Sequence, residues 1–156
     1  MRKLVALVAI SALACMAMAS KPKTPPAPPL SPLEANRKLV RDMVQTLFVE
    51  HKVDEAVTKY FDPNYIQHSP LAANGAQPLA AFFKQYYQTA PGSTVKVANV
   101  LCEGDLCAVH YNAIPKPGDR GIAMVDIFRI ANGKLAEHWS VSQPVPETSA
   151  NNNTMF

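Results

Sequence analysis

Apolar residues in the first half of the chain recur at helical spacing and form three separate stripes. A capping box at Ser31 and Glu34, with a proline between them, predicts where the first helix begins. Pro63 is expected to end the second helix, and Pro91 marks the end of the third. The stripes comprise Leu39, Val40, Met43, Val44, Leu47 and Phe48, then Val53, Ala56, Val57, Tyr60 and Phe61, and finally Leu79, Phe82, Phe83, Tyr86 and Tyr87.

After residue 94 the spacing changes to the alternation that is typical of strands. Asn132-Gly133 is the strongest hairpin signal in the chain, because both residues tolerate the positive φ angles of a tight turn. Helices followed by strands favour an α+β domain with an antiparallel sheet that helices cover on one face. Strands are predicted near residues 94–103, 106–114, 121–130 and 134–142, with a short extended piece at 65–68 before them.

The first 19 residues have the features of a cleaved signal peptide: a basic start at Arg2 and Lys3, a short apolar stretch, and small residues before Ser20. This predicts an exported chain, periplasmic or secreted, with no stable membrane insertion after cleavage. A lipidated Cys15 is the alternative interpretation. Residues 20–31 are rich in proline and predict an extended linker, residues 32–148 a single domain, and residues 149–156 a polar tail.

The charge of the chain gives no sign of a nucleic-acid partner. The chain has 15 basic and 12 acidic residues, and removing Arg2 and Lys3 with the signal peptide leaves 13 basic residues and a net charge of +1. No basic patch is interleaved with aromatic residues, so nucleic-acid binding is not expected. The histidines and cysteines lack metal-binding spacing, so no metal site is predicted.

Cys102 and Cys107 flank a predicted two-residue turn at Gly104-Asp105, which places them opposite each other with Cα atoms about 5.5 Å apart. In an oxidising compartment such a pair is expected to form a disulfide. The alternative is two buried, apolar thiols. A catalytic role is not expected, because no base or cation is evident beside either sulfur.

Asp126 is the strongest candidate for chemistry, because it lies inside the apolar strand around Met124 and Phe128. A carboxylate among apolar side chains is costly to ionise, which suits a general acid or base. If Asn132-Gly133 is a two-residue turn, Asp126 faces Trp139 across the hairpin, and His138 points to the other face unless a bulge shifts the register. The alternative is a structural carboxylate held by tyrosine or backbone donors.

Two further histidines are candidates for orienting or protonating a ligand oxygen: His110 in mid-strand and His68 at the end of the extended piece. The alternative for each is a satisfied histidine in the core or at its rim. His51 is expected only to be a cation at a helix end. The candidate ligand-binding residues are aromatic, although they also fit a plain hydrophobic core. They are Tyr65, Phe83, Phe128 and Trp139.

Several segments, in order along the chain, resemble the SnoaL-like polyketide cyclase group of the nuclear transport factor 2-like superfamily. The resemblance covers about residues 32–156 and is more specific for the fold than for the activity. The matching segments are Tyr65-Ile66-Gln67-His68-Ser69-Pro70, Gly104-Asp105-Leu106, Val109-His110, Asp126-Ile127-Phe128-Arg129, Gly133-Lys134-Leu135-Ala136-Glu137-His138-Trp139 and Asn153-Thr154-Met155-Phe156.

The resemblance implies a cone-shaped α+β fold, in which three N-terminal helices and a strongly curved antiparallel sheet enclose a cavity. It also implies that Asp126 matches the acid/base aspartate of cyclase members, which catalyse an intramolecular aldol condensation without a cofactor. Ser140 stands where the group often has an acidic residue, and Leu71 stands where close relatives often have a histidine. A less polar pocket is therefore expected.

Two functions remain open. In the first, the protein is a cofactor-independent enzyme of the aldol-condensation, isomerase or lyase type that acts on a small apolar carbonyl compound. Asp126 would remove a proton next to the carbonyl, and His110 or His68 would steady the enolate oxygen. In the second, the same cavity serves a non-catalytic exported binding domain, or the chain is a homodimeric interaction module. A cavity lined by Asp126, with a histidine within hydrogen-bonding reach, would favour the enzyme.

Overall fold

The computed structural model describes residues 28–156. The predicted signal peptide, its cleavage site and most of the predicted linker lie outside these residues. Among the helices of this part of the chain, none is both long enough and apolar enough to cross a membrane.

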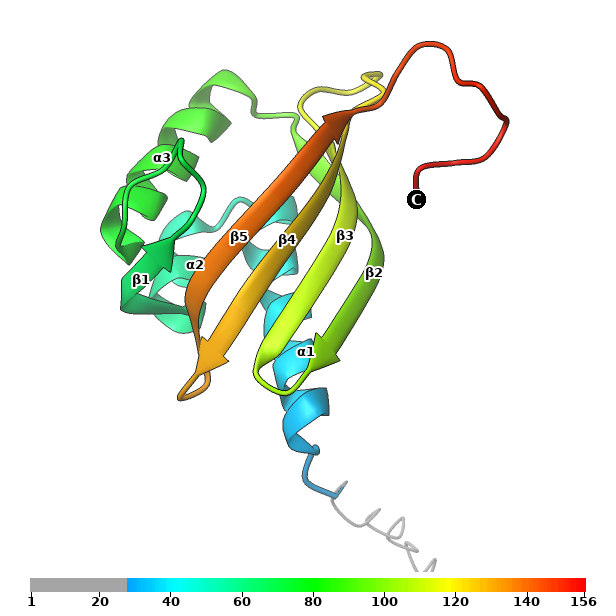
Figure 1. Cartoon of the computed structure of the whole chain (residues 1–156). Helices are drawn as coiled ribbons and strands as arrows, with labels where there is room; N and C mark the ends of the chain where they lie inside the picture. Colours follow the sequence, from blue (N-terminus) through cyan, green and yellow to red (C-terminus); the bar gives the residue numbers. More distant parts are fainter. Residues whose placement is uncertain (1–27) are drawn as a thin grey trace, which may run out of the picture.

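The helices cover one face of a curved five-stranded sheet (Figure 1). The predicted α+β architecture is confirmed, and the helices precede most of the strands. The elements are α1 (Pro32–Val44), the π-helix η1 (Gln45–Val49), α2 (Val53–Tyr60), β1 (Phe61–Gln67), α3 (Ala76–Thr89), β2 (Thr94–Glu103), β3 (Leu106–Ile114), β4 (Ile122–Ala131) and β5 (Lys134–Pro144).

The strands are ordered β1-β5-β4-β3-β2. Neighbours from β5 to β2 are antiparallel as predicted, whereas β1 runs parallel to β5. The expected end of the second helix at Pro63 is wrong, because α2 ends at Tyr60 and Phe61 is already the first residue of β1. Pro63 lies within this strand, which is at the edge of the sheet, where a missing N–H need not break a ladder.

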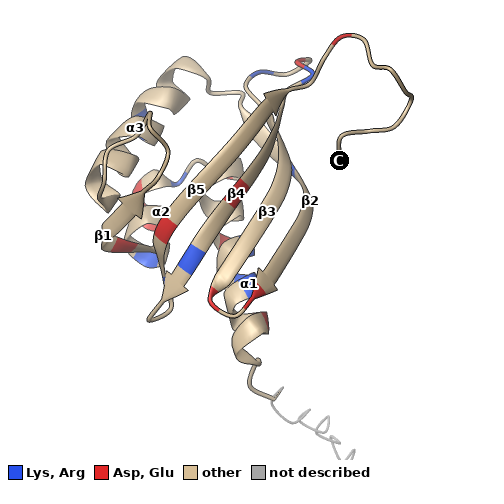
Figure 2. Cartoon of the chain, in the orientation of Figure 1, with Lys and Arg blue, Asp and Glu red and all other residues tan. Residues whose placement is uncertain are grey.

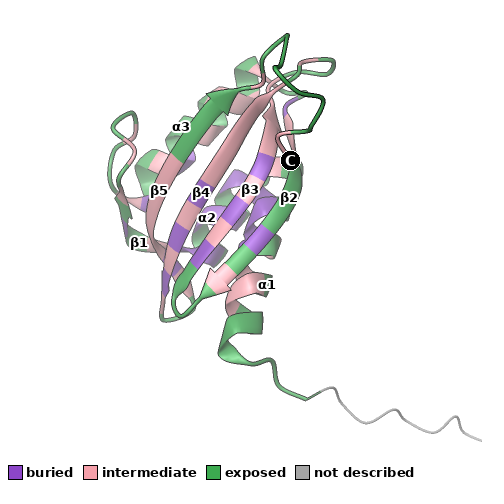
Figure 3. Ribbon diagram, turned by 45° about the vertical axis from the view of Figure 1, so that its right-hand side comes forward, coloured by how far each residue is buried: buried purple, intermediate pink, exposed green. Residues whose placement is uncertain are grey.

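The start of α1 confirms the predicted capping box. The Ser31 hydroxyl accepts a hydrogen bond from the N–H of Glu34, and the Glu34 carboxylate accepts one from the N–H of Ser31. Figure 3 shows buried segments alternating with partly exposed ones along β3 and β4, so one face of the sheet is buried. The core lies between this inner face and the helices. Its most buried side chains include Val40, Met43, Leu47, Val109 and Leu135.

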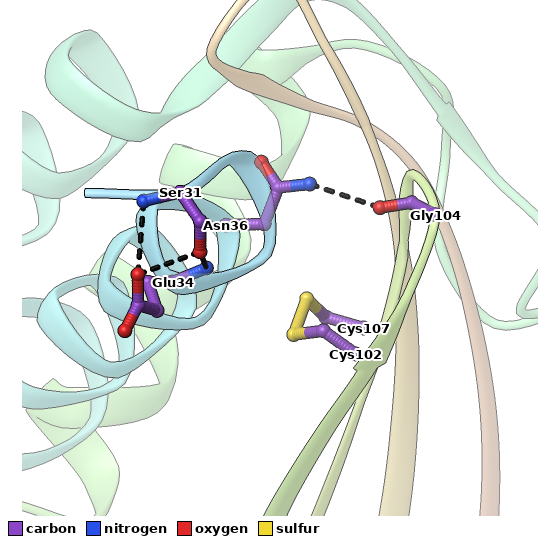
Figure 4. Close-up of a disulfide and its surroundings, with 6 residues drawn as sticks. All are labelled: Ser31, Glu34, Asn36, Cys102, Gly104 and Cys107. Atoms are coloured by element: carbon purple, nitrogen blue, oxygen red, sulfur yellow. Dashed lines mark hydrogen bonds between the residues drawn. A yellow bond between two sulfur atoms is a disulfide. The ribbon is translucent and has the colours of Figure 1, made fainter. Parts of the chain in front are cut away.

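A disulfide joins β2 to β3 close to their turn. Cys102 and Cys107 are directly opposite each other, as the predicted hairpin requires, and their Cα atoms are 4.1 Å apart, closer than the predicted spacing. Figure 4 shows the bridge beside α1, where the Asn36 amide donates to the Gly104 carbonyl. The disulfide therefore closes the hairpin, and this hydrogen bond ties its turn to α1.

The predicted pairing of the β4–β5 hairpin is wrong beyond its first residues. Near the turn, Ile130 lies opposite Leu135 as predicted, but a bulge follows and leaves Ala136 as an extra residue in β5. Asp126 therefore lies opposite Ser140 instead of Trp139. Because successive residues of a strand point to opposite faces, this shift of one residue places His138 on the inner face and Trp139 on the outer face.

The bulge lies where β5 meets distant parts of the chain. Edge strand β1 pairs with Leu135 and then with Glu137, so its own register is also interrupted here. The N–H of Ile130 donates to the carbonyl of Asp105 in the β2–β3 turn at 2.7 Å. These contacts with distant segments give hydrogen-bond partners to backbone groups at the bulge. The local sequence pattern of the hairpin carries no information about such contacts.

Candidate functional site

The helices and the inner face of the sheet enclose a cavity of about 480 Å³. Its lining is mostly aromatic and aliphatic, and no described Lys or Arg contributes to it. Such a space suits a small, largely apolar molecule. Within residues 28–156, no three His, Cys, Asp or Glu side chains gather in a way that could hold a metal ion.

Asp126, in the middle of β4, is the one carboxylate among the described residues that line the cavity. It is 3% exposed, and the Tyr111 hydroxyl of β3 donates to its Oδ2 at 2.7 Å. Burial, and after it the neighbouring Asp126 carboxylate, raises the pKa of Tyr111 well above its ordinary value. Tyr111 therefore remains a protonated donor that orients the carboxyl group and leaves Oδ1 free.

His138 approaches the same carboxyl group from β5. Its Nδ1 lies 2.8 Å from Oε1 of Gln67, and the N–H of Ser69 donates to that oxygen at 3.1 Å. An amide oxygen only accepts hydrogen bonds, so Nδ1 of His138 carries a proton and donates it to Gln67. The other ring nitrogen, Nε2, lies 3.2 Å from Oδ1 of Asp126.

Nε2 of His138 and Oδ1 of Asp126 are buried, and neither has an aligned hydrogen-bond partner within residues 28–156. With Nδ1 protonated, a neutral ring would turn a lone pair toward an ionised carboxylate, and these two acceptors would repel. One proton on the ring or on the carboxyl group removes the conflict. A buried pair of this kind beside a cavity is suited to exchanging a proton with a bound molecule.

Aromatic rings pack around this pair. Phe128 stacks on His138 with ring centroids 5.0 Å apart, and Tyr65 lies over the same imidazole at 6.3 Å. Phe48 belongs to the π-helix η1 and stacks on Tyr111 at 5.8 Å. Insertions of this kind in a helix recur at functional sites, and here the insertion carries one wall of the cavity.

The structure brings four of the predicted site residues together. Asp126, Tyr65, Phe83 and Phe128 all line the cavity. Leu71 and Ser140 line it as well, which agrees with the expectation of a less polar pocket.

The other three predicted residues lie on the outer face of the sheet. His68 stacks on Trp139 with centroids 4.5 Å apart, and its Nε2 lies 3.2 Å from Oε2 of Glu137. His110 stacks on Phe156 of the C-terminal tail at 5.5 Å. His68, His110 and Trp139 are therefore not among the described residues that line this cavity, and the predictions that they contact a ligand there find no support in its lining. The alternation of β3 and the shifted register of β5 turn these side chains away from the cavity.

The sequence analysis did not select His138, Tyr111 or Gln67. The sequence did allow His138, because one extra residue in the hairpin would turn the His138 side chain to the inner face and the Trp139 side chain to the outer face. Tyr111 lies two residues after Val109, which pairs with Asp126, so alternation along β3 could have found it. Gln67 reaches the site through the parallel pairing of β1 with β5, which no local pattern predicts.

Comparisons with known proteins give one family and one fold. The model of the SnoaL-like domain matches residues 40–138. A candidate ketosteroid isomerase from Kribbella flavida is 20% identical with a TM-score of 0.63, and the match covers 76% of this chain and 85% of that chain. TsrD from Streptomyces laurentii is 18% identical with a TM-score of 0.60 and coverage of 73% and 91%. IdmH from Streptomyces antibioticus, a candidate polyketide cyclase, is 16% identical with a TM-score of 0.58 and coverage of 69% and 91%. No curated protein matches the sequence at a significant level.

Proposed function

Because the chain belongs to the SnoaL-like family, we propose that it is an acid/base enzyme that acts without a cofactor on a small, largely apolar carbonyl compound. Proteins of similar fold include a candidate polyketide cyclase and a candidate ketosteroid isomerase, which supports chemistry of the aldol, isomerase or lyase type. The observation that carries the proposal is the buried pair of Asp126 and His138 at the cavity, with one oxygen and one nitrogen left without partners.

The reaction begins with proton transfer from carbon. With the shared proton on His138, Oδ1 of Asp126 accepts a proton from the carbon next to the ligand carbonyl. The Nε2–H of His138 donates to the carbonyl oxygen as negative charge develops there. The C–H bond breaks, a carboxyl O–H bond forms, and the ligand becomes an enolate. Return of the proton to another carbon is an isomerisation, and attack of the enolate carbon on a second carbonyl is an aldol ring closure.

The apolar lining supports this chemistry. Excluding water strengthens the hydrogen bond from His138 to the developing oxyanion, since the local dielectric constant is low. Tyr111 keeps Oδ2 occupied, so Oδ1 is the oxygen that faces the ligand. The lining contains no described Lys or Arg, and the charge of a protonated His138 is balanced by Asp126, which favours an uncharged ligand over a carboxylate or a phosphate.

Exchange of carbon-bound hydrogen for deuterium tests the proposal. The protein is incubated in D₂O with a panel of β-dicarbonyl and polyketide-like ketones, and NMR follows the loss of the α-proton signal. We expect exchange above the buffer rate for at least one compound, and a loss of this exchange in Asp126→Asn. Exchange that Asp126→Asn leaves intact would contradict the role of Asp126. Binding without any exchange would support the alternative, a non-catalytic binding domain that uses the same cavity.

The outer face of the sheet supports a homodimer as a second part of the proposal. Leu101 and Val141 on this face are each 67% exposed, and Figure 2 shows few charged residues over most of the sheet. An apolar centre with a polar rim is typical of an interface, and members of this family often form dimers. Two neighbouring rows of paired residues form the centre of this face. One row is Leu101, Ala108, Ile127 and Trp139, and the other contains His110, Val125 and Val141. The rows that flank them contain charged and polar residues: Arg129 and Glu137 on one side, Lys96 and Gln143 on the other.

Sedimentation velocity tests the dimer. We expect the wild type to sediment as a dimer and Val141→Lys to sediment as a monomer, because a lysine in the apolar row places an unpaired charge in the interface. Leu33→Lys is the matched control, since Leu33 is also exposed but lies on α1, one of the helices that cover the opposite face of the sheet. A monomeric wild type, or a dimer that survives Val141→Lys, would contradict this part of the proposal.

Export is the third part of the proposal, with a mature chain that begins at Ser20. The pattern of residues 1–19 supports it, and so does the disulfide between Cys102 and Cys107, because such bonds persist in oxidising compartments. The intact mass of the native protein checks this. A chain that starts at Met1, or one with a lipid mass on Cys15, would contradict it.

A further inference from the structure

The cavity has a second polar position, away from Asp126 and His138. Ser93 lines the cavity and is 7% exposed, and its hydroxyl has no hydrogen-bond partner within the described residues. A buried hydroxyl without a partner costs free energy comparable to a lost hydrogen bond. Ser93 is therefore a polar group that a molecule in the cavity could satisfy.

Ser93 is held in place by neighbours on two sides. Its N–H donates to the carbonyl of Ala90 at 3.0 Å, and its own carbonyl accepts from Nε2 of His51 at 2.9 Å. The His51 ring stacks on Tyr87 with centroids 3.8 Å apart, and the Tyr87 hydroxyl donates to the carbonyl of Leu47 at 2.7 Å. The position of Ser93 is thus fixed before a ligand binds.

His51 adopts a strained backbone conformation in this arrangement. Its φ is 55°, in the left-handed region that residues other than glycine seldom occupy. The sequence analysis treated His51 only as a cation at a helix end. In the structure its ring instead joins the end of η1, helix α3 and the segment that carries Ser93.

The two polar positions are far apart along the sheet. Asp126 pairs with Val109 of β3, whereas Thr94, which follows Ser93, pairs with Ile114 at the end of that strand. Val109 and Ile114 are five positions apart in β3, which corresponds to about 17 Å along an extended strand. The sheet is curved (Figure 1), so the straight distance between the two positions is shorter than this path. A molecule that reaches both has to be elongated.

We infer that Ser93 forms a second polar subsite that binds an oxygen at the far end of an elongated, uncharged, apolar ligand. A hydroxyl both donates and accepts, so the far group of the ligand is a hydroxyl or a carbonyl. The Ser93 subsite lies in the same cavity as the proposed catalytic pair. Only the position of the ligand carbonyl beside Asp126 rests on the proposed function. The selectivity is a property of binding and does not require turnover.

Two pairs of aromatic ketones of different length test the subsite. The pairs are 2-acetylnaphthalene with 6-acetyl-2-naphthol, and 4-acetylbiphenyl with 4-acetyl-4′-hydroxybiphenyl. Within each pair only the far hydroxyl differs. Dissociation constants for the wild type, Ser93→Ala and Ser140→Ala are measured by calorimetry or fluorescence. Ser140→Ala is the matched control, because Ser140 also lines the cavity but pairs with Asp126.

For at least one pair we expect the wild type to bind the hydroxylated ketone about twofold to tenfold more tightly than its parent. In Ser93→Ala the preference should reverse, because the ligand hydroxyl would be buried without a partner. Ser140→Ala should retain the preference. Melting temperatures confirm that the variants are folded.

Each other outcome identifies what is wrong. Equal affinity within both pairs, or a preference that Ser93→Ala leaves intact, overturns the subsite while the cavity and the catalytic proposal stand. A wild type that binds none of the four ketones overturns the subsite together with the apolar ligand of the proposed function. If the wild type prefers the hydroxylated ketones through Ser93 but exchanges no α-proton of any compound, only the catalytic proposal is overturned.

Discussion

A histidine, a carboxylate and an aromatic ring meet on each face of the sheet. On the inner face, His138 lies 3.2 Å from Asp126 and stacks on Phe128. On the outer face, His68 lies 3.2 Å from Glu137 and stacks on Trp139. The residue types and the distances are therefore almost the same.

Burial and hydrogen bonding separate the two groups. The side chains of His138 and Asp126 are 13% and 5% exposed, against 39% and 18% for His68 and Glu137. Glu137 also accepts from Arg129, and hydrogen bonds from Arg129 and then His68 lower its pKa. The outer carboxylate is thus satisfied and stays ionised, whereas the inner pair keeps two buried atoms for a ligand. The comparison teaches that unmet hydrogen bonding in an apolar cavity, more than residue type, marks the site.

The sharpest way to break this comparison is to remove one carboxylate at a time. Asp126→Asn keeps the shape of the side chain and removes proton transfer, so the rate of α-proton exchange should fall roughly 10²–10⁴-fold. Ligand affinity and melting temperature should change little. Glu137→Gln makes the same chemical change on the outer face and should leave the rate unchanged. Equal losses in the two variants would show that the faces do not differ in function.

The histidines give a second matched pair. His138→Gln replaces the protonated ring that donates to the developing oxyanion with a neutral amide, and the rate should fall about 10²-fold, as when other donors of this kind are lost. His68→Gln should have almost no effect on the rate, because its ring stacks on Trp139 outside the cavity. Steady-state kinetics of both variants check the prediction. A larger loss for His68→Gln would mean that the outer face takes part in the reaction.

Gln67 sharpens the comparison further, because it sets which nitrogen of His138 carries the proton. Gln67→Leu removes the acceptor for Nδ1–H, so the rate should fall by roughly threefold to tenfold, the worth of one hydrogen bond. Nitrogen NMR of His138 should show mixed tautomers in this variant and a protonated Nδ1 in the wild type. Gln67→Glu retains an acceptor and should preserve the wild-type tautomer. An unchanged tautomer in Gln67→Leu would rule out this positioning role.

The smallest effect concerns the stability of the outer face in acid. The pKa of Glu137 is lower in the folded state than its ordinary value of 4.5, so its carboxylate stabilises the fold at pH values above 4.5. This contribution to the free energy of unfolding is lost as the pH falls through the lowered pKa of the folded state. The gap in the free energy of unfolding between wild type and Glu137→Gln should therefore be largest near neutral pH and close in acid. Urea unfolding at about pH 7 and about pH 3 measures it. A gap that does not depend on pH would show that the carboxylate charge contributes nothing.

Local patterns predicted most of the elements, because the information that defines them is local. The bounds of β2 and β3 match the predicted residues 94–103 and 106–114, since alternation and the turn at Gly104-Asp105 are read within a few residues. The same turn placed Cys102 opposite Cys107. The parallel pairing of β1 with β5 was not predicted, because it joins segments about 70 residues apart through backbone groups that every sequence carries.

The sequence by itself determined that Asp126 faces the core, because alternation from Met124 to Phe128 decides which side chains of β4 are buried. Only the tertiary structure decided that His138 is its partner. A strand has a period of two, so the single extra residue Ala136 exchanges the faces of His138 and Trp139. That bulge lies where β5 pairs with β1 and where Ile130 bonds to the β2–β3 turn, and hydrogen bonds between distant segments form only once the chain has folded.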